Sequence, residues 1–263
     1  GLITMIRRIL GCHVLRKIPI KKTVKKCAIG VELVGLMSSL SSAGSRYFEP
    51  VENVVNPLKT AHKNKPKSIN WETAEKKIAE LNAGIIQKKM DSLLFKRQKA
   101  KILTIMNEDK SCNDTVNKNK VADYIVKISR EYGVDPVQIA CIAKQETHFT
   151  ENRNGEFGKG MMQITSITTK DMYQRPQFFH KKLKEITSKY KNYKELYKAL
   201  QTNPQLNMRV GVILYQARLN EAKGNIRTAL INYNGSPIRY KYASDVFADI
   251  KKYSPQLRKS GQK

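Results

Sequence analysis

The chain has 263 residues, and its 40% hydrophobic content suffices for a buried core in part of that length. Its 49 Lys and Arg outnumber 22 Asp and Glu, which gives a net charge of +27 and favours polyanionic surroundings: nucleic acid, an anionic membrane surface or a cell wall. The basic residues are scattered and accompany no zinc finger or aromatic-rich strand motif, so the sequence argues against a nucleic-acid-binding protein.

The first segment has the layout of a secretory signal. Between Arg7 and Lys26 lie eight basic residues and no acidic one, and an apolar stretch rich in small residues, 28–44, follows. We therefore predict a signal or targeting segment over residues 1–45, and a location outside the cytoplasm, in the periplasm or cell envelope. An uncleaved anchor that holds the chain at a membrane is the alternative, although the apolar stretch is shorter than the roughly 20 residues of a spanning helix.

Residues 46–67 carry three prolines among polar and basic residues and show no helical or strand period, so they are predicted to be a linker. Apolar residues then recur at three- and four-residue steps, which predicts a helical extension and connector over 68–119, made of one or two helices with a break near Gly84. This extension is a candidate contact surface for other envelope proteins. We interpret Trp71 as a packing residue rather than a sugar-stacking one.

Residues 120–253 are predicted to form a helical main domain, followed by a basic tail over 254–263. Amphipathic patterns and capping signals predict helices that begin near Val121, at Pro136, after Asn203-Pro204, at Ile226 and before Tyr242. The segment 166–200 is rich in Lys and Tyr. It either lines a glycan groove with aromatic rings or forms an amphipathic helical insertion with a basic, solvated face.

The helix predicted over 136–149 carries the candidate acid, Glu146. The residues three, four and seven positions before it are aliphatic and share its face, which is the buried face of the helix: Ala143, Ile142 and Ile139. A carboxyl group held there is partly desolvated, which raises its pKa toward the range where it can donate a proton near neutral pH. The glycine-rich segment 150–160 is predicted to leave the helix and fold back as a loop.

The sequence offers no metal site. No pair among the four cysteines has metal-ligand spacing, and Glu146 and His148 are two positions apart, which points them to different sides of a helix. We therefore expect neither a metal nor a cofactor. Cys112 and Cys141 either pair in an oxidising compartment, or Cys141 is a small buried hydrophobe.

Three short segments occur in order along the domain: Gln145-Glu146-Thr147, Gly160-Met161-Met162-Gln163 and Ile231-Asn232-Tyr233-Asn234-Gly235. Together they resemble the lytic transglycosylases with a goose-lysozyme-like catalytic domain, the soluble lytic transglycosylase family. That family has a Glu-Ser pair at a helix end, then a Gly-Leu-Met-Gln turn, then Ala-Tyr-Asn before a glycine. The chain departs from this pattern twice, with Thr147 in place of Ser and Asn232 in place of Ala.

The resemblance implies a mainly α, lysozyme-like (goose-type) helical catalytic domain with an N-terminal helical extension. It implies a bacterial cell-wall enzyme, a lyase-type lytic transglycosylase that cleaves the MurNAc-β-1,4-GlcNAc glycosidic bond of peptidoglycan strands and leaves a 1,6-anhydroMurNAc end. Glu146 would be the general acid and then the base while the substrate's own 6-hydroxyl attacks, which fits the scarcity of a second carboxylate. The alternatives are a goose-type muramidase that hydrolyses the same bond, and a non-catalytic wall-binding or assembly protein.

The resemblance also implies a set of substrate-binding residues around the acid: Thr147, Met162, Gln163, Tyr233 and Asn234. Gln163 would position the substrate, Met162 would lie under the sugar, and the Tyr233 hydroxyl would stabilise the acid or the developing positive charge. Plain packing is the alternative for Met162 and Tyr233. We expect the carboxyl group of Glu146 to lie close to the amide of Gln163 and the phenol of Tyr233.

Overall fold

The computed structural model describes residues 71–254. The predicted targeting segment over 1–45, the linker over 46–67 and the basic tail after Ser254 lie outside the described residues. The chain divides into two compact units, residues 1–94 and 95–263. In the described part, the first unit contributes the beginning of one helix, and the second unit contains the folded domain.

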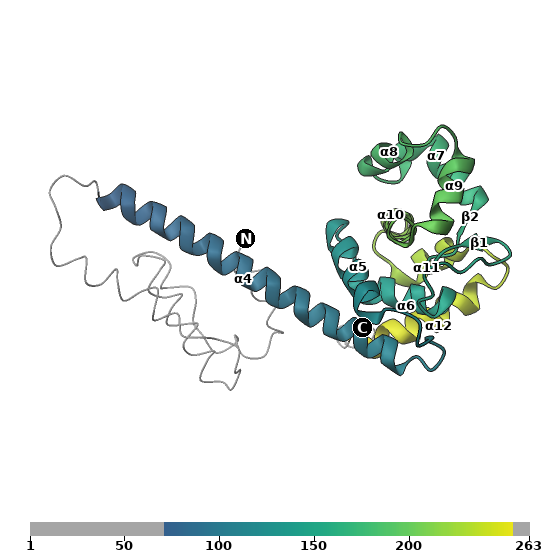
Figure 1. Cartoon of the computed structure of the whole chain (residues 1–263), viewed down its shortest axis with the longest axis horizontal. Coiled ribbons are helices and arrows are strands. Elements are labelled where there is room, and N and C mark those ends of the chain that lie inside the picture. The colour runs from purple at the N-terminus through teal and green to yellow at the C-terminus, as the bar shows by residue number, and fades with distance from the viewer. Residues whose placement is uncertain (1–70, 255–263) are drawn as a thin grey trace. The chain divides into compact units, whose positions relative to one another are not determined.

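Helix α4 (Trp71–Glu108) runs without interruption through Gly84, so the break considered there is absent (Figure 1). A glycine inside a helix costs roughly 1 kcal/mol relative to alanine, which is too little to end a helix of 38 residues. Ile102 and Ile105 near its end have no exposed surface. The last turns of α4 therefore belong to the core of the second unit. The side chain of Trp71 lies outside the described part of the structure.

The folded domain is a group of helices (Figure 1). Their buried apolar side chains form a single core. Its central helices are α5 (Lys118–Glu131), α6 (Pro136–Thr147), α10 (Pro204–Glu221), α11 (Ile226–Asn234) and α12 (Arg239–Tyr253). Helix α11 packs against α10 and α12, and α12 also packs against α6. The mainly helical fold predicted from the sequence is confirmed. Within residues 71–254, no helix has the length and apolar character needed to span a membrane.

Helix α6 begins as predicted and ends two residues early. The Asp135 side chain accepts a hydrogen bond from the Val137 N–H at 2.9 Å, and a proline occupies the first helical position. The helix stops because His148 and Phe149 adopt left-handed backbone conformations, with φ of 51° and 64°. The Phe149 ring has no exposed surface, so its burial offsets the strain of that conformation.

A small hairpin follows α6. Strands β1 (Gly158–Lys159) and β2 (Ile164–Thr165) pair antiparallel, with Gly158 opposite Thr165. Residues 160–163 form the turn between the strands, and the Gln163 N–H donates to the Gly160 carbonyl at 3.1 Å. The loop that was predicted to return toward the acid helix therefore does so as a hairpin.

The segment 166–200 is a helical insertion of α7 (Ser166–Gln174), the 3-10 turn η2 (Pro176–Phe178), α8 (Lys181–Thr187) and α9 (Tyr193–Thr202). Three of its aromatic rings pack against the core: Tyr173, Phe179 and Tyr190. Glu131 at the end of α5 accepts hydrogen bonds from Lys182 of α8 at 2.9 Å and Arg209 of α10 at 2.6 Å. The structure favours the amphipathic insertion over a groove lined by all of these rings.

Candidate active site

Glu146 lies in the last turn of α6, with its side chain only partly exposed. The aliphatic residues that precede it on this helix have no exposed surface: Ile139, Ile142 and Ala143. From α12, the Tyr242 hydroxyl donates a hydrogen bond to Glu146 Oε1 at 2.7 Å. Burial raises the pKa of Glu146 to about 7, against the smaller lowering effect of that hydrogen bond. A substantial fraction of this carboxyl group is therefore protonated near neutral pH.

Hydrogen bonds from two hydroxyl groups hold the turn at residues 160–163 near Glu146. Thr147 Oγ1 donates to the Met161 carbonyl at 3.1 Å, and the Tyr233 hydroxyl donates to the Met162 carbonyl at 2.9 Å. Burial, followed by the nearby charge of Glu146, holds the pKa of the Tyr233 phenol well above its ordinary value. Tyr233 therefore remains a neutral hydrogen-bond donor in the neighbourhood of the acid.

A buried amide holds the same turn from the opposite side. Asn207 of α10 accepts a hydrogen bond from the Met162 N–H at 2.8 Å and donates to the Lys159 carbonyl at 2.7 Å. Gly160 has a φ of 68°, and a Cβ atom added there would lie 2.3 Å from Asn207 Nδ2. Glycine is required at this position because both the backbone conformation and the space exclude a side chain.

The helical fold, the acid at the end of a helix and the clamped Gly-Met-Met-Gln turn agree with one protein family. A family model described as the transglycosylase SLT domain matches residues 123–252. Residues 123–252 belong to the transglycosylase SLT domain family. The resemblance seen in the sequence and the lysozyme-like fold are thereby confirmed, and the domain is of a type that acts on peptidoglycan. Comparisons with curated proteins and with solved structures gave no match.

Two of the predicted substrate-binding side chains of the SLT domain make local contacts. Gln163 Nε2 donates to the Gly160 carbonyl at 2.7 Å, and Asn234 Oδ1 accepts from the Ser236 N–H at 3.2 Å. Within residues 71–254, no hydrogen bond joins either amide to Glu146. Both side chains therefore stabilise the loops in which they lie.

Met162 lies inside the SLT domain, with no exposed surface. A Cβ atom added at Gly211 of α10 would come within 2.6 Å of the Met162 side chain. The hairpin can approach α10 this closely because position 211 has no side chain. The structure thus brings Met162, Thr147 and Tyr233 together with Glu146, and it places Met162 in the packing beneath the turn.

Sequence reasoning missed the role of Tyr242. The sequence pattern placed this residue only in the last predicted helix, and in the structure its hydroxyl group donates a hydrogen bond to the acid. A buried phenol needs a hydrogen-bond partner, which was the signal available in the sequence. A second contact, from Lys144 Nζ to Asp249 Oδ2 at 2.7 Å, also joins α6 to α12.

No second carboxylate acts on Glu146 within residues 71–254. The causes of its raised pKa include burial and the Tyr242 hydrogen bond, and no acidic residue. Two acidic residues in the segments that adjoin α6 have cationic partners: Glu151, in the loop after α6, pairs with Lys120, and Asp249 of α12 pairs with Lys144. The SLT domain therefore presents one carboxyl group for acid–base chemistry.

Metal-ligating residues do not gather in the described residues, where no group of three or more His, Cys, Asp or Glu could hold a metal ion. His148 Nδ1 instead contacts the buried carboxylate of Asp109 at 3.0 Å. Cys112 and Cys141 are buried and free rather than paired. Burial raises the pKa of both thiols, so the reactive thiolate form is disfavoured.

Proposed function

We propose that the chain is a peptidoglycan lytic transglycosylase in which Glu146 is both the general acid and the base. One observation carries the proposal: a single carboxyl group, buried at a helix end and bonded to Tyr242, has a pKa raised to about 7. The SLT family assignment supplies the substrate class, peptidoglycan. An acid with this pKa is available in both protonation states near neutral pH, as a residue that gives and then takes a proton requires.

The chemistry follows from the two oxygens of Glu146. Oε1 accepts the Tyr242 hydrogen bond, which orients the carboxyl group and leaves Oε2 to carry the proton. That proton passes to the oxygen of the MurNAc-β-1,4-GlcNAc bond, and the bond to MurNAc C1 breaks. The resulting carboxylate removes the proton of the MurNAc 6-hydroxyl, whose oxygen then bonds to C1. The products are a free GlcNAc hydroxyl and a 1,6-anhydroMurNAc end, and no water is consumed.

The lack of a second carboxylate favours this route over hydrolysis. Inverting glycosidases need a base to activate water, and retaining ones need a nucleophile, each supplied by a second carboxyl group about 5–9.5 Å from the first. Within residues 71–254, no acidic residue is among the causes that shift the pKa of Glu146. An internal hydroxyl of the substrate removes the need for one.

Digestion of purified peptidoglycan followed by mass analysis tests the proposal. We expect soluble fragments whose muramyl ends are lighter by one water than hydrolysed ends. Fragments with intact reducing ends would instead identify a muramidase. Binding to the wall without release of soluble fragments, over a range of pH values, would identify a non-catalytic wall-binding protein. Either result would overturn the transglycosylase proposal.

We further propose that the protein acts outside the cytoplasm, in the periplasm or envelope, because its substrate lies there. The basic and then apolar composition of residues 1–45 supports export through a signal. A fusion of these residues to a phosphatase that is active only after export tests this proposal. Enzyme activity in intact cells is expected, and its absence would contradict export by this segment.

A further inference from the structure

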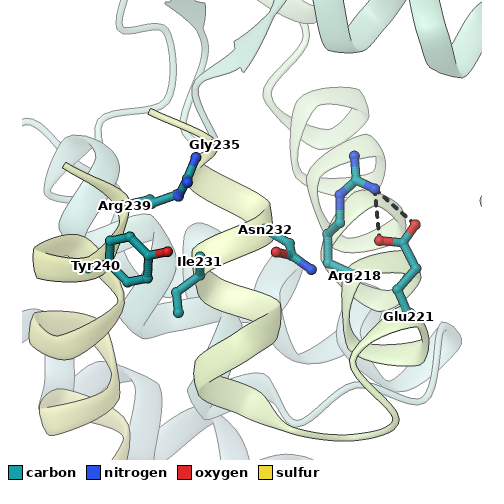
Figure 2. A pocket seen from close by; sticks show the side chains of 7 residues that line it. All are labelled: Arg218, Glu221, Ile231, Asn232, Gly235, Arg239 and Tyr240. Carbon is teal, nitrogen blue, oxygen red and sulfur yellow. Dashed lines mark hydrogen bonds and ion pairs between the residues drawn. The ribbon is translucent and has the colours of Figure 1, made fainter. Parts of the chain in front are cut away.

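A concave site lies between the end of α10, the outer side of α11 and the start of α12. The hollow has a volume of about 470 Å³. Figure 2 shows the residues that line it: Arg218, Glu221, Ile231, Asn232, Gly235, Arg239 and Tyr240. The hollow is open to solvent, so a ligand bound there would remain partly exposed. Neither Tyr242, which donates a hydrogen bond to Glu146, nor Tyr233 is among the residues that line it.

The hollow and the acid lie on opposite sides of helix α11. Ile231 and Gly235 are four positions apart and share the side of α11 that lines the hollow. Tyr233 lies two positions from each, which is about half a turn, so it points to the opposite side of the helix. Its hydroxyl accordingly reaches the Met162 carbonyl beside the acid. Helix α11 thus stands between the two sites.

Asn232 is the residue at which the chain departs from the Ala-Tyr-Asn pattern. The structure places it on the exposed surface of α11, where its side chain lies in the hollow on the side of Arg218 (Figure 2). A carboxamide in place of a methyl group adds a donor and an acceptor to this site. The departure therefore changes the lining of the hollow, and the hydrogen bond that Glu146 accepts comes from Tyr242 rather than from Asn232.

The donors in the hollow are mainly guanidinium groups. Arg218 uses Nη1 to contact both oxygens of Glu221 at 2.9 Å, and its buried Nε has no hydrogen-bond acceptor in the described residues. Arg239 forms no ion pair within residues 71–254, and its guanidinium group lies 5.3 Å from the centre of the Tyr240 ring. Tyr240 is 62% exposed. An unpaired guanidinium beside an open aromatic face suits a ligand with a carboxylate and an apolar surface.

We propose that this hollow is an accessory site for the peptide carboxylate of a muramyl peptide, away from the bond that is cleaved. The proposal rests on the proposed function, because peptidoglycan is the polymer that would present such a group. Arg239 binds the carboxylate, the Asn232 amide bonds the peptide backbone, and the Tyr240 ring packs on apolar parts of the ligand. A site outside the cleavage cleft would hold the enzyme on its polymer between cleavage events.

Titration of the full chain with N-acetylmuramyl dipeptide tests the site without turnover, because this probe has one sugar and no bond to cleave. The matched probe is the same molecule with its free carboxylate converted to an amide. We expect wild-type protein to bind the acid about tenfold more tightly than the amide. In Arg239→Gln this preference should disappear, whereas Lys241→Gln, next to the hollow and 79% exposed, should keep it.

The outcomes separate this inference from the proposed function. Equal binding of acid and amide by wild-type protein, or an unchanged preference in Arg239→Gln, overturns the accessory site even if anhydromuramyl products are found. A lost preference in Arg239→Gln with no cleavage of peptidoglycan supports the site and counts against the enzyme. Melting temperatures should be equal in the three proteins, since both substituted side chains are on the surface.

Discussion

The two sides of helix α11 face different electrostatic environments, one buried near a carboxyl group and the other open to water beside guanidinium groups. Its inner side carries Tyr233, which lies close enough to Glu146 for that charge to raise the pKa of its phenol. Its outer side carries Asn232, in an open hollow with Arg218 and Arg239. Exclusion of water keeps a carboxyl group partly neutral on the inner side, whereas water on the outer side leaves guanidinium groups charged and accessible. We infer that the first environment suits proton transfer and the second suits recognition of charge.

The largest expected effect is on the inner side. Glu146→Gln keeps the shape of the side chain and removes the titrating proton, so we expect peptidoglycan cleavage to fall by about 10²–10⁴-fold, the usual contribution of a general acid or base. The rate of release of soluble fragments measures this. The matched control is Glu156→Gln, an exposed acidic residue on the loop after α6, which should keep wild-type activity. Similar rates for both variants would remove Glu146 from the mechanism.

The next largest effect is expected from a substitution that disturbs the packing of the turn at residues 160–163 against Asn207. Gly160→Ala should lower the free energy of unfolding by about 2–3 kcal/mol, since it adds a clash with Asn207 to a left-handed backbone. Gly133→Ala is the matched control: its φ is 69°, and no atom lies within 4 Å of the added Cβ. It should cost about 1 kcal/mol. Chemical denaturation of both variants measures the difference, and equal losses would show that the contact with Asn207 is unimportant.

Much of this inner side could be predicted from the sequence, because it depends on local spacing. The 3.6-residue period placed Glu146 on the face of Ile142, and Asp135-Pro136 marked the start of the helix. The partner of the acid could not be found in this way. Tyr242 is 96 positions from Glu146, and their contact depends on how α12 packs against α6. Local spacing carries no information about that arrangement.

The hydrogen bonds of Gln163 were also beyond prediction. The family resemblance placed its amide near the acid, and the structure adds that this amide donates to the carbonyl of Gly160 from a residue with a left-handed backbone, φ 46°. Asn232 precedes Tyr233 in the same motif, yet it is exposed and lines the hollow on the outer side of α11. A motif gives the order of residues, and the helical period then decides which of two neighbours faces inward.

Tyr242→Phe tests the comparison between the two sides of α11, because it removes the hydrogen bond from Tyr242 to Glu146 on the inner side. That bond lowers the pKa of Glu146 against the larger effect of burial, so its loss should move the pKa above 7. Cleavage that needs the protonated acid falls as pH rises through this value. The alkaline limb of the pH–rate profile should therefore move to higher pH. Tyr240→Phe, on the outer side, is the control and should leave the limb in place. A downward shift in Tyr242→Phe would contradict the assigned contact.

Asn232→Ala is expected to have the smallest effect on folding. It restores the alanine of the family pattern at an exposed position, so the free energy of unfolding should change by no more than about 0.5–1 kcal/mol. Affinity for N-acetylmuramyl dipeptide should nevertheless fall by about fivefold, because one hydrogen bond to the probe is lost. Calorimetric titration measures this. Unchanged affinity would remove Asn232 from the hollow's ligand-binding role.

The most direct test of the account is the titration of Glu146 itself. Carbon NMR of protein labelled at the glutamate carboxyl groups, with Glu146→Gln to assign the resonance, gives its pKa in the folded chain. The account predicts a midpoint near pH 7, as burial beside Tyr242 requires. A midpoint near the ordinary value of 4.5 would contradict it, because the carboxyl group would then be ionised at neutral pH and unable to donate a proton.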